Sequence, residues 1–261
     1  MHAKSIFYYC LTLVSINLIS CNFQITSNEG KGPLIDKTYQ YKFTALEQDN
    51  GIESKIYKSN EHKVVVNAPN DIIDNILVEM EGDHKVHIHV KNNSNISTAK
   101  VTVKIYTPYL TELDASSAAE VQVIDTFVAE KIVLESGSGA EIKGSFKALT
   151  GNVKASSGSS IDVNILGETI SVESTSGSEI TLSGLAKQTD MKASSGSQID
   201  GEKFVSQSSN LESSSGAEIS LGVTLKTIAK SSSGSNIDIY KRSNQIEISK
   251  EVSSGGSVDL H

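Results

Sequence analysis

The segment from Leu134 to Ile142 reads Leu-Glu-Ser-Gly-Ser-Gly-Ala-Glu-Ile, and versions of it recur through the second half of this 261-residue chain. Eight copies follow one another at intervals of 18 to 21 residues. Aligned on one small residue, they are centred on Ala118, Gly139, Gly158, Gly177, Gly196, Gly216, Gly234 and Gly255. A near-constant period of about 20 residues indicates one supersecondary unit stacked on copies of itself. The repeat therefore predicts a solenoid.

Each copy places apolar residues on both sides of a small, polar turn. The residue three after the aligned position is always β-branched and aliphatic, and the residue five before it is apolar in every copy except the last, which has Lys250. β-Branched residues favour strands, and serine and glycine favour tight turns. Flexible linkers would not keep this spacing. We therefore expect an all-β fold, a β-solenoid resembling a right-handed β-helix, with about eight rungs over residues 113–261 after less regular strands.

One column of charged residues predicts the register of the rungs. Four residues before the aligned position, the sign alternates in every copy from the second to the last, through Glu135, Lys154, Glu173, Lys192, Glu212, Lys230 and Glu251. Parallel, in-register strands lie about 4.8 Å apart, so each lysine would lie between two glutamates. Opposite charges at facing strand positions favour pairing. The column predicts a structural charge ladder on a solvated face.

The turns supply the candidate binding residues. Serine precedes the aligned position in all eight copies, and stacking would place these hydroxyls in one ridge. A hydroxyl both donates and accepts hydrogen bonds, so the column could bond along the stack or to a ligand. The candidate ridge consists of Ser138, Ser157, Ser176, Ser195, Ser215 and Ser233.

The N-terminus reads as an export signal. Residues 6–19 are largely apolar, and Leu18-Ile19-Ser20-Cys21 resembles a bacterial lipobox. We expect a lipoprotein signal peptide over residues 1–20, lipid attachment at Cys21 and a tether over 21–37; an ordinary signal peptide with an incidental cysteine is the alternative. Cys10 is the only other cysteine, so the mature chain would contain no free thiol. No later segment has the 18 apolar residues of a membrane-spanning helix.

Residues 38–112 form a second β-rich region, and 38–261 reads as one continuous domain. Strands are expected over 39–46, 63–67, 84–90 and 99–106, with a turn at Glu81-Gly-Asp83. Residues 69–75 predict a short helical turn capped by Asn70 or Asp71. These strands could form early rungs or cap the end of the solenoid, since an uncovered solenoid end invites aggregation.

The chain as a whole resembles a bacterial family known as putative auto-transporter adhesin, head-GIN domain. The resemblance covers about residues 38–245 and rests on Phe43–Leu46, Asn50-Gly51-Ile52, Val64–Pro69 and Thr111–Ser117 leading into the Ser-Gly repeats. It implies a β-helical fold in exported proteins, often lipoproteins of Bacteroidetes-type bacteria. It supplies no catalytic residues.

The pattern of residues indicates no cofactor and no metal site. His87 and His89 share a strand face, but that face shows no third ligand, so His84, His87 and His89 read as solvated strand residues. No histidine lies between His89 and His261, so the ridge serines lack a histidine base. The glutamates two residues after the aligned position and the aspartates four residues after it could form two acidic columns that bind Ca²⁺. The net charge of −8 without a basic patch excludes a nucleic-acid partner.

These observations favour a non-catalytic lipoprotein of the cell envelope, anchored to the outer membrane and facing the periplasm or the cell surface. Its solenoid would act as an adhesin that binds a glycan or a surface protein, with exposed tyrosines such as Tyr106, Tyr109 and Tyr240 available to stack on sugars. One alternative is an envelope scaffold that self-associates through the solenoid ends. A β-helical polysaccharide lyase or hydrolase is less favoured, because no carboxylate differs from the rest of its column.

Overall fold

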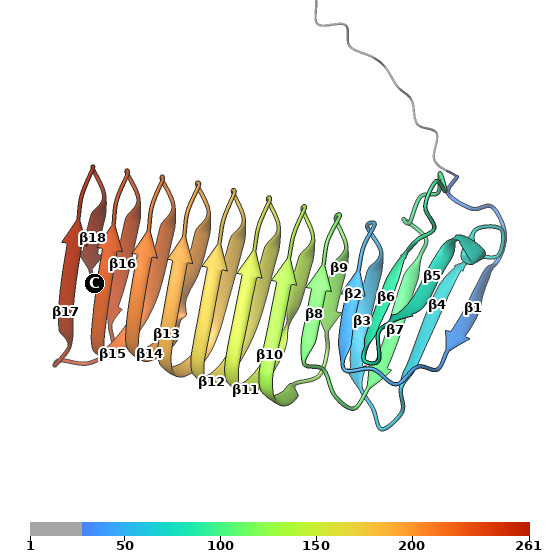
Figure 1. Ribbon diagram of the computed structural model, residues 1–261, viewed down its shortest axis with the longest axis horizontal. Helices are drawn as coiled ribbons and strands as arrows, with labels where there is room; N and C mark the ends of the chain where they lie inside the picture. The colour runs from blue at the N-terminus through green and yellow to red at the C-terminus, as the bar shows by residue number, and fades with distance from the viewer. Residues whose placement is uncertain (1–27) are drawn as a thin grey trace, which may run out of the picture.

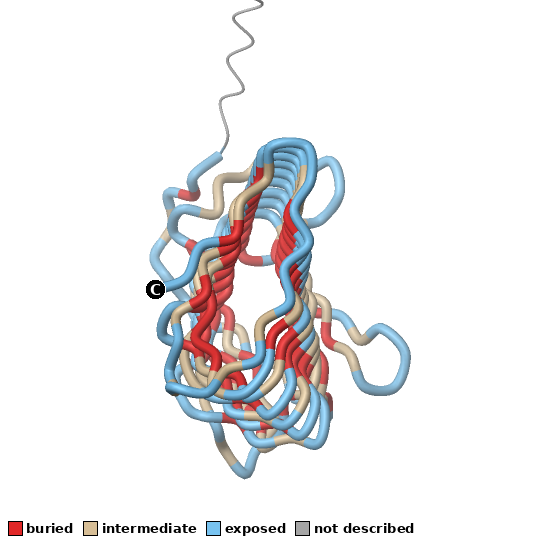
Figure 2. Tube along the Cα trace, turned by 90° about the vertical axis from the view of Figure 1, so that its left-hand side faces the viewer, coloured by how far each residue is buried: buried red, intermediate tan, exposed pale blue. Residues whose placement is uncertain are grey.

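Two walls of parallel strands, joined at each rung by a tight turn, form most of the molecule (Figure 1). The computed structural model describes residues 28–261. Viewed along the axis, buried residues line the inside of both walls and exposed residues cover the outside and the turns (Figure 2). The fold is an all-β solenoid of about eight turns, as the repeat predicted.

The repeat region supplies the regular rungs. Its strands are β8 (Glu112–Ala115), β9 (Glu120–Val123), β10 (Phe127–Ser136), β11 (Glu141–Ala155), β12 (Ser160–Ser174), β13 (Glu179–Ala193), β14 (Gln198–Ser213), β15 (Glu218–Ser231), β16 (Asn236–Lys241), β17 (Glu247–Val252) and β18 (Ser257–Leu260). Each long strand from β11 to β15 leaves a Ser-Gly turn along one wall, bends, and returns along the other wall to the next turn. A rung therefore has two strand segments, a sharp edge at the turn and a broader bend edge.

The apolar columns occupy the core as predicted. Ile142, Ile161 and Ile180 are register partners in successive rungs, and all three are buried. Val153, Val172 and Met191 pair in the same way on the opposite wall. Burying a side chain of this size contributes about 1.5–3 kcal/mol. Phe127, Phe146 and Phe204 are also buried in the interior.

The Ser-Gly turns owe their shape to two consecutive residues with positive φ. The serines of the candidate ridge have φ of 50 to 57°, and the glycines that follow have φ of 67 to 73°. The flanking residues close the turn, as where Ala140 N donates to Gly137 O at 3.0 Å, which is the pattern of a type I′ turn. Each turn also bonds to the next: Gly139 N donates to Ser157 O at 3.2 Å. Backbone hydrogen bonds thus hold the row of turns in register.

Buried serines reinforce this edge from inside. Ser159 Oγ donates to the carbonyl of Ser136 in the previous rung at 2.6 Å, and Ser197 Oγ donates to Ser174 O at 2.6 Å. A buried hydroxyl without a partner would cost about 1–3 kcal/mol. The ridge hydroxyls could have bonded along the stack, but the side-chain hydrogen bonds between rungs are made by buried hydroxyls beside the turn.

The N-terminal region extends the solenoid out of sequence order. Its elements are β1 (Leu34–Tyr39), β2 (Ala45–Gln48), β3 (Glu53–Lys58), β4 (Lys63–Pro69), η1 (Ile73–Asn75), β5 (Ile76–Glu81), β6 (Lys85–Val90) and β7 (Thr102–Thr107). β2 and β3, joined at Asn50-Gly51, form a further rung between β8/β9 on one side and β6/β7 on the other. Asn50 and Gly51 both have positive φ, so this turn repeats the Ser-Gly geometry.

Beyond β6 and β7 the strand direction reverses. β5 pairs antiparallel with β6, β4 with β7, and β1 with β4, so these three strands cover the N-terminal end of the solenoid. Both roles considered for this region, early rungs and a cap, are present.

Three details of the sequence prediction were wrong here. The strand expected over 39–46 is two strands, β1 and β2, because the chain crosses from the cap to a rung between them. The predicted tether ends too late, since residues 34–37 already pair with β4. The helical turn has no side-chain cap; the Asp71 carboxylate instead accepts hydrogen bonds from the backbone N–H groups of Lys31 and Gly32.

Candidate functional site

The candidate ridge serines form a continuous exposed row along the turn edge, which is the upper edge in Figure 1. We call Ser138, Ser157, Ser176, Ser195, Ser215 and Ser233 the serine ridge. Within residues 28–261, no hydrogen bond engages any of these six hydroxyls. All six are therefore free to meet solvent or a ligand, although their backbone carbonyls are used in the ladder of turns.

Serine is a costly choice at these positions. A non-glycine residue in the left-handed region costs about 1–2 kcal/mol, and asparagine tolerates that region better than serine. The chain uses asparagine in the equivalent turn at Asn50. The requirement for positive φ therefore explains why these positions are small and polar, and it does not explain why the repeat keeps serine.

A shallow groove runs beside the ridge on the wall that leads into the turns. One stretch of it has a volume of about 640 Å³ and is lined by charged residues and by hydroxyl-bearing residues, namely Glu173, Lys192, Glu212, Lys230 and Glu251, and Thr175, Ser194, Ser214, Ser232 and Ser253. A smaller stretch of about 310 Å³ continues it past Lys154 and Glu135 to Asp114, and the two stretches share Glu173 and Thr175. We call this surface the ladder groove.

The charge ladder has the predicted register. Glu135 pairs with Lys154, Lys154 with Glu173, and so on in parallel to Lys230 and Glu251. Within this ladder, only two pairs of neighbouring residues are close enough to form ion pairs. Lys192 Nζ lies 3.4 Å from Glu212 Oε2, and Lys230 Nζ lies 3.3 Å from Glu251 Oε2. Exposed ion pairs contribute about 0–1 kcal/mol each. The column therefore favours the register only weakly, and three of its seven charged groups, those of Glu135, Lys154 and Glu173, form no ion pair within residues 28–261.

The alternation of charge fails at the N-terminal end of the ladder. Asp114 lies between Glu135 and, in the inserted rung, Glu47, so three carboxylates follow one another. Burial, together with the charges of Glu47 and Glu135, raises the pKa of Asp114 to about 6. Lys85, which contacts Glu112 at 2.6 Å and Glu47 at 3.6 Å, acts in the opposite direction. This end of the groove carries an excess of negative charge.

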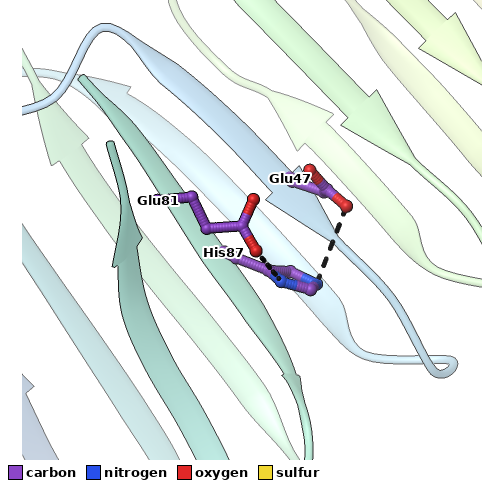
Figure 3. Close-up of side chains that lie close together, drawn as sticks. All are labelled: Glu47, Glu81 and His87. Atoms are coloured by element: carbon purple, nitrogen blue, oxygen red, sulfur yellow. Dashed lines mark hydrogen bonds and ion pairs between the residues drawn. The ribbon is translucent and has the colours of Figure 1, made fainter. Parts of the chain in front are cut away.

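His87 lies next in the same column and binds carboxylates through both ring nitrogens (Figure 3). Nδ1 lies 3.0 Å from Glu81 Oε1, and Nε2 lies 2.9 Å from Asp49 Oδ2 and 3.9 Å from Glu47 Oε1. Burial lowers the pKa of His87, but the hydrogen bonds to Asp49 and Glu81 outweigh it and the pKa lies above its usual value. The ring also stacks on His89, with 4.2 Å between centroids.

This cluster differs from the solvated histidines that we expected. His84 is exposed, but the side chain of His87 is only 16% exposed and that of His89 is 15% exposed. The histidines' own strand offers no further acidic ligand. The carboxylates come instead from the inserted strand β2, the residue that follows it, and the end of β5, and strand pairing alone reveals them.

The remaining candidates lie apart from these features. Tyr109 is 62% exposed, whereas Tyr106 stacks on Tyr57 and Tyr240 stacks on His261. The proposed acidic columns are interrupted, since Ser160 separates Glu141 from Glu179 and Thr181 separates Asp162 from Asp200.

Cys21 and the predicted signal peptide lie outside the described residues. In the described part of the chain, no helix is long and apolar enough to span a bilayer.

Comparison with solved structures finds the same fold in other bacterial proteins. A putative adhesin from Parabacteroides merdae superposes with a TM-score of 0.82 at 14% identity, covering 89% of this chain and 98% of that one. A putative adhesin from Parabacteroides distasonis gives 0.81 at 16% identity, covering 90% and 99%. A putative lipid-binding protein from the same species gives 0.76 at 15% identity, covering 89% and 98%. At these identities the likeness concerns the fold alone.

Sequence comparison supplies the family. No curated protein matches the chain. Residues 42–243, which span the inserted rung, the cap strands β4 and β5 and nearly all the Ser-Gly rungs, match a family whose description names no enzyme. By this match the chain belongs to the family of the putative auto-transporter adhesin, head GIN domain.

Proposed function

We propose that this protein is a non-catalytic adhesin of the cell envelope and that the serine ridge and ladder groove are its adhesive surface. The ligand class that fits this surface is an extended glycan, bound through many weak polar contacts. A surface protein that presents such a chain would bind in the same way.

One observation carries the proposal. Every turn of the serine ridge places a serine in the left-handed backbone region, and the hydroxyl of that serine makes no hydrogen bond within residues 28–261. Backbone strain that recurs where a less strained residue would serve points to a role for the side chain itself. These serines differ from a strain-free glycine by a hydroxymethyl side chain, whose hydroxyl is its only polar group.

The groove beside the ridge supplies matching chemistry. It is open and shallow, and it offers hydroxyl, ammonium and carboxylate groups at the strand spacing of about 4.8 Å. A polymer with regularly spaced hydroxyl groups could donate to the glutamates and accept from the lysines in successive rungs. Because the contacts repeat, their effects combine along a single bound chain.

Anchoring at Cys21 forms part of this proposal. A lipid at that residue would attach the solenoid to the outer membrane, and the adhesin family fits a protein of the cell surface or envelope. Protease treatment of intact cells, followed by detection of the repeat region, tests the orientation. Loss of signal supports surface display, and protection until the outer membrane is permeabilised contradicts it.

Removal of ridge hydroxyls tests the adhesive surface. The variant Ser157→Gly, Ser176→Gly, Ser195→Gly keeps the turn geometry, since glycine adopts positive φ without strain. We expect at least a tenfold loss of binding across a polysaccharide panel, with a melting temperature that is unchanged or higher. The control Thr150→Ala, Thr169→Ala removes hydroxyls from the bend edge and should bind normally. Unchanged binding by the glycine variant would remove the ridge from the adhesive surface.

A further inference from the structure

The charge ladder indicates which kind of glycan fits the ladder groove. We propose that the groove binds an extended zwitterionic polysaccharide, in which sugars that carry an ammonium group alternate with sugars that carry a carboxylate. This inference rests on the proposed function, because it names the ligand class of the same groove.

The ladder presents charges of alternating sign at a constant spacing. Its seven members are register partners in successive rungs, namely Glu135, Lys154, Glu173, Lys192, Glu212, Lys230 and Glu251. In-register strands lie about 4.8 Å apart, so charges of the same sign recur about every 9.6 Å. One sugar residue of an extended chain spans about the distance between two rungs. A chain with a disaccharide repeat therefore has the same period as the ladder.

The charged groups of the ladder are accessible to such a chain. All of them are exposed except Glu135, which is half-buried. The side chains of Lys192 and Glu212 are 64% and 51% exposed, although the two form an ion pair. Exposed ion pairs are weak, so a ligand group of the right sign can replace either partner. Glu135, Lys154 and Glu173 form no ion pair within residues 28–261 and need no such exchange.

The groove contains few charges besides those of the ladder. The other residues that line its larger stretch are uncharged, and most of them are serines. The smaller stretch adds one further charged residue, Asp114, at its N-terminal end. Because the lysines and glutamates of the ladder nearly cancel, the groove selects a ligand by the order of its charges and not by its net charge.

A polymer with charges of one sign does not fit this surface. A polyanion in the groove would meet a glutamate at every second rung, and a polycation would meet a lysine. Like charges at facing positions oppose binding. An alternating chain places each ammonium group beside a glutamate and each carboxylate beside a lysine. These contacts are charge-assisted hydrogen bonds, which are stronger than bonds between neutral groups, and they repeat at every rung.

Three polymers with one backbone test the proposal. Hyaluronan alternates a carboxylate sugar with an N-acetylated amino sugar and is a polyanion. Removal of its acetyl groups gives a zwitterionic polymer, and reduction of the carboxylates in that product gives a polycation. We expect the protein to bind the zwitterionic polymer at least tenfold more tightly than either of the others. Calorimetry at about pH 5.5, where amino sugars are protonated and glutamates remain ionised, measures the three affinities.

Exchange of two neighbouring charges tests whether their order matters. Glu173→Lys combined with Lys192→Glu keeps the net charge but places like charges side by side in the ladder. This variant should bind the zwitterionic polymer at least tenfold more weakly, and circular dichroism checks its fold. If it misfolds, Lys154→Gln combined with Lys192→Gln provides the test. That variant lacks partners for the ligand carboxylates, so the preference for the zwitterionic polymer over the polycation should disappear.

Glu168→Lys combined with Lys187→Glu is the matched control. Glu168 and Lys187 form an exposed ion pair between neighbouring rungs and line neither stretch of the groove, so binding should be unchanged. The proposal is overturned if the exchanged ladder binds as the unmodified protein does. It is also overturned if hyaluronan or the polycation binds as tightly as the zwitterionic polymer.

The failure of this inference differs from the failure of the proposed function. Binding to neutral polysaccharides but to none of the three polymers overturns the zwitterionic ligand alone. The absence of binding to any polysaccharide removes the proposed function as well.

Discussion

Replacement of Asp114 by asparagine should stabilise the fold at neutral pH. Asp114 lies between Glu47 and Glu135 in the only stretch of the charge ladder with three adjacent carboxylates. Burial and these neighbours raise its pKa from an ordinary value of 3.8 to about 6. The folded state therefore disfavours the ionised carboxylate, and the neutral amide of asparagine removes that penalty while keeping the size of the side chain.

The pKa difference sets the size of the effect. The two values differ by about 2, and each pH unit corresponds to about 1.4 kcal/mol, so the penalty has an upper limit of about 3 kcal/mol. Asp114 is only partly buried, and solvent screening reduces this to about 1–2 kcal/mol. For a chain of this length, the melting temperature should rise by roughly 2–8 °C.

The pH dependence identifies the cause. Between pH 3.8 and 6 the folded state binds more protons at Asp114 than the unfolded state does, so its contribution to stability falls as the pH rises. The advantage of Asp114→Asn should be absent below about pH 4, grow through pH 6 and remain constant above it. Urea denaturation followed by circular dichroism, at several pH values in EDTA, measures this profile.

A control separates this effect from a general loss of negative charge. Asp162 faces Lys143 in the register, so Asp162→Asn should give no stabilisation at pH 7. The reasoning is refuted if Asp114→Asn gives no gain in stability at pH 7. A gain that persists at pH 4 would refute it equally, since asparagine would then act by packing and not by charge.

Three further perturbations address the fold. Ile180→Asp places an unpaired charge in a fully buried column and should cost more than about 4 kcal/mol, seen as a loss of cooperative melting; an unchanged melting curve would contradict the assigned register. Gly184→Ala should lower stability in urea denaturation more than Gly177→Ala does. A Cβ at Gly184 would lie 2.2 Å from the Ile165 carbonyl oxygen, whereas a Cβ at Gly177 would meet open space and cost only about 1–2 kcal/mol for the positive φ. Equal losses of stability in the two variants would contradict this prediction. Lys192→Glu places like charges together in the ladder and should lower stability by about 1 kcal/mol at low salt, with a smaller loss at high salt.

The repeat itself determined most of the solenoid. Contacts between rungs join residues about 19 positions apart, as Ile161 joins Ile180, so the period of the sequence is also the register of the strands. The alternating ladder from Glu135 to Glu251 confirms this register independently. A regular stack makes the same contacts in every rung, and for that reason a single chain reveals them by self-comparison.

The structure alone decided where the N-terminal strands lie. β2 and β3 enter the stack between strands that follow them in sequence, and Asn50-Gly51 is a rung turn that does not share the Ser-Gly motif. Such an insertion joins segments at unequal separations, and no period in the sequence reports it.

The candidate sites also differ in whether the sequence or only the tertiary structure identifies them. The sequence determined which residues form the serine ridge and the charge ladder, because each consists of one position of the repeat copied along the stack. The cluster of Glu47, Asp49, Glu81 and His87 depends on three strands from different parts of the chain meeting at one place. Only the tertiary structure brings the three carboxylates to the His87 ring, because their convergence depends on a non-periodic pairing of strands and not on any local pattern of residues.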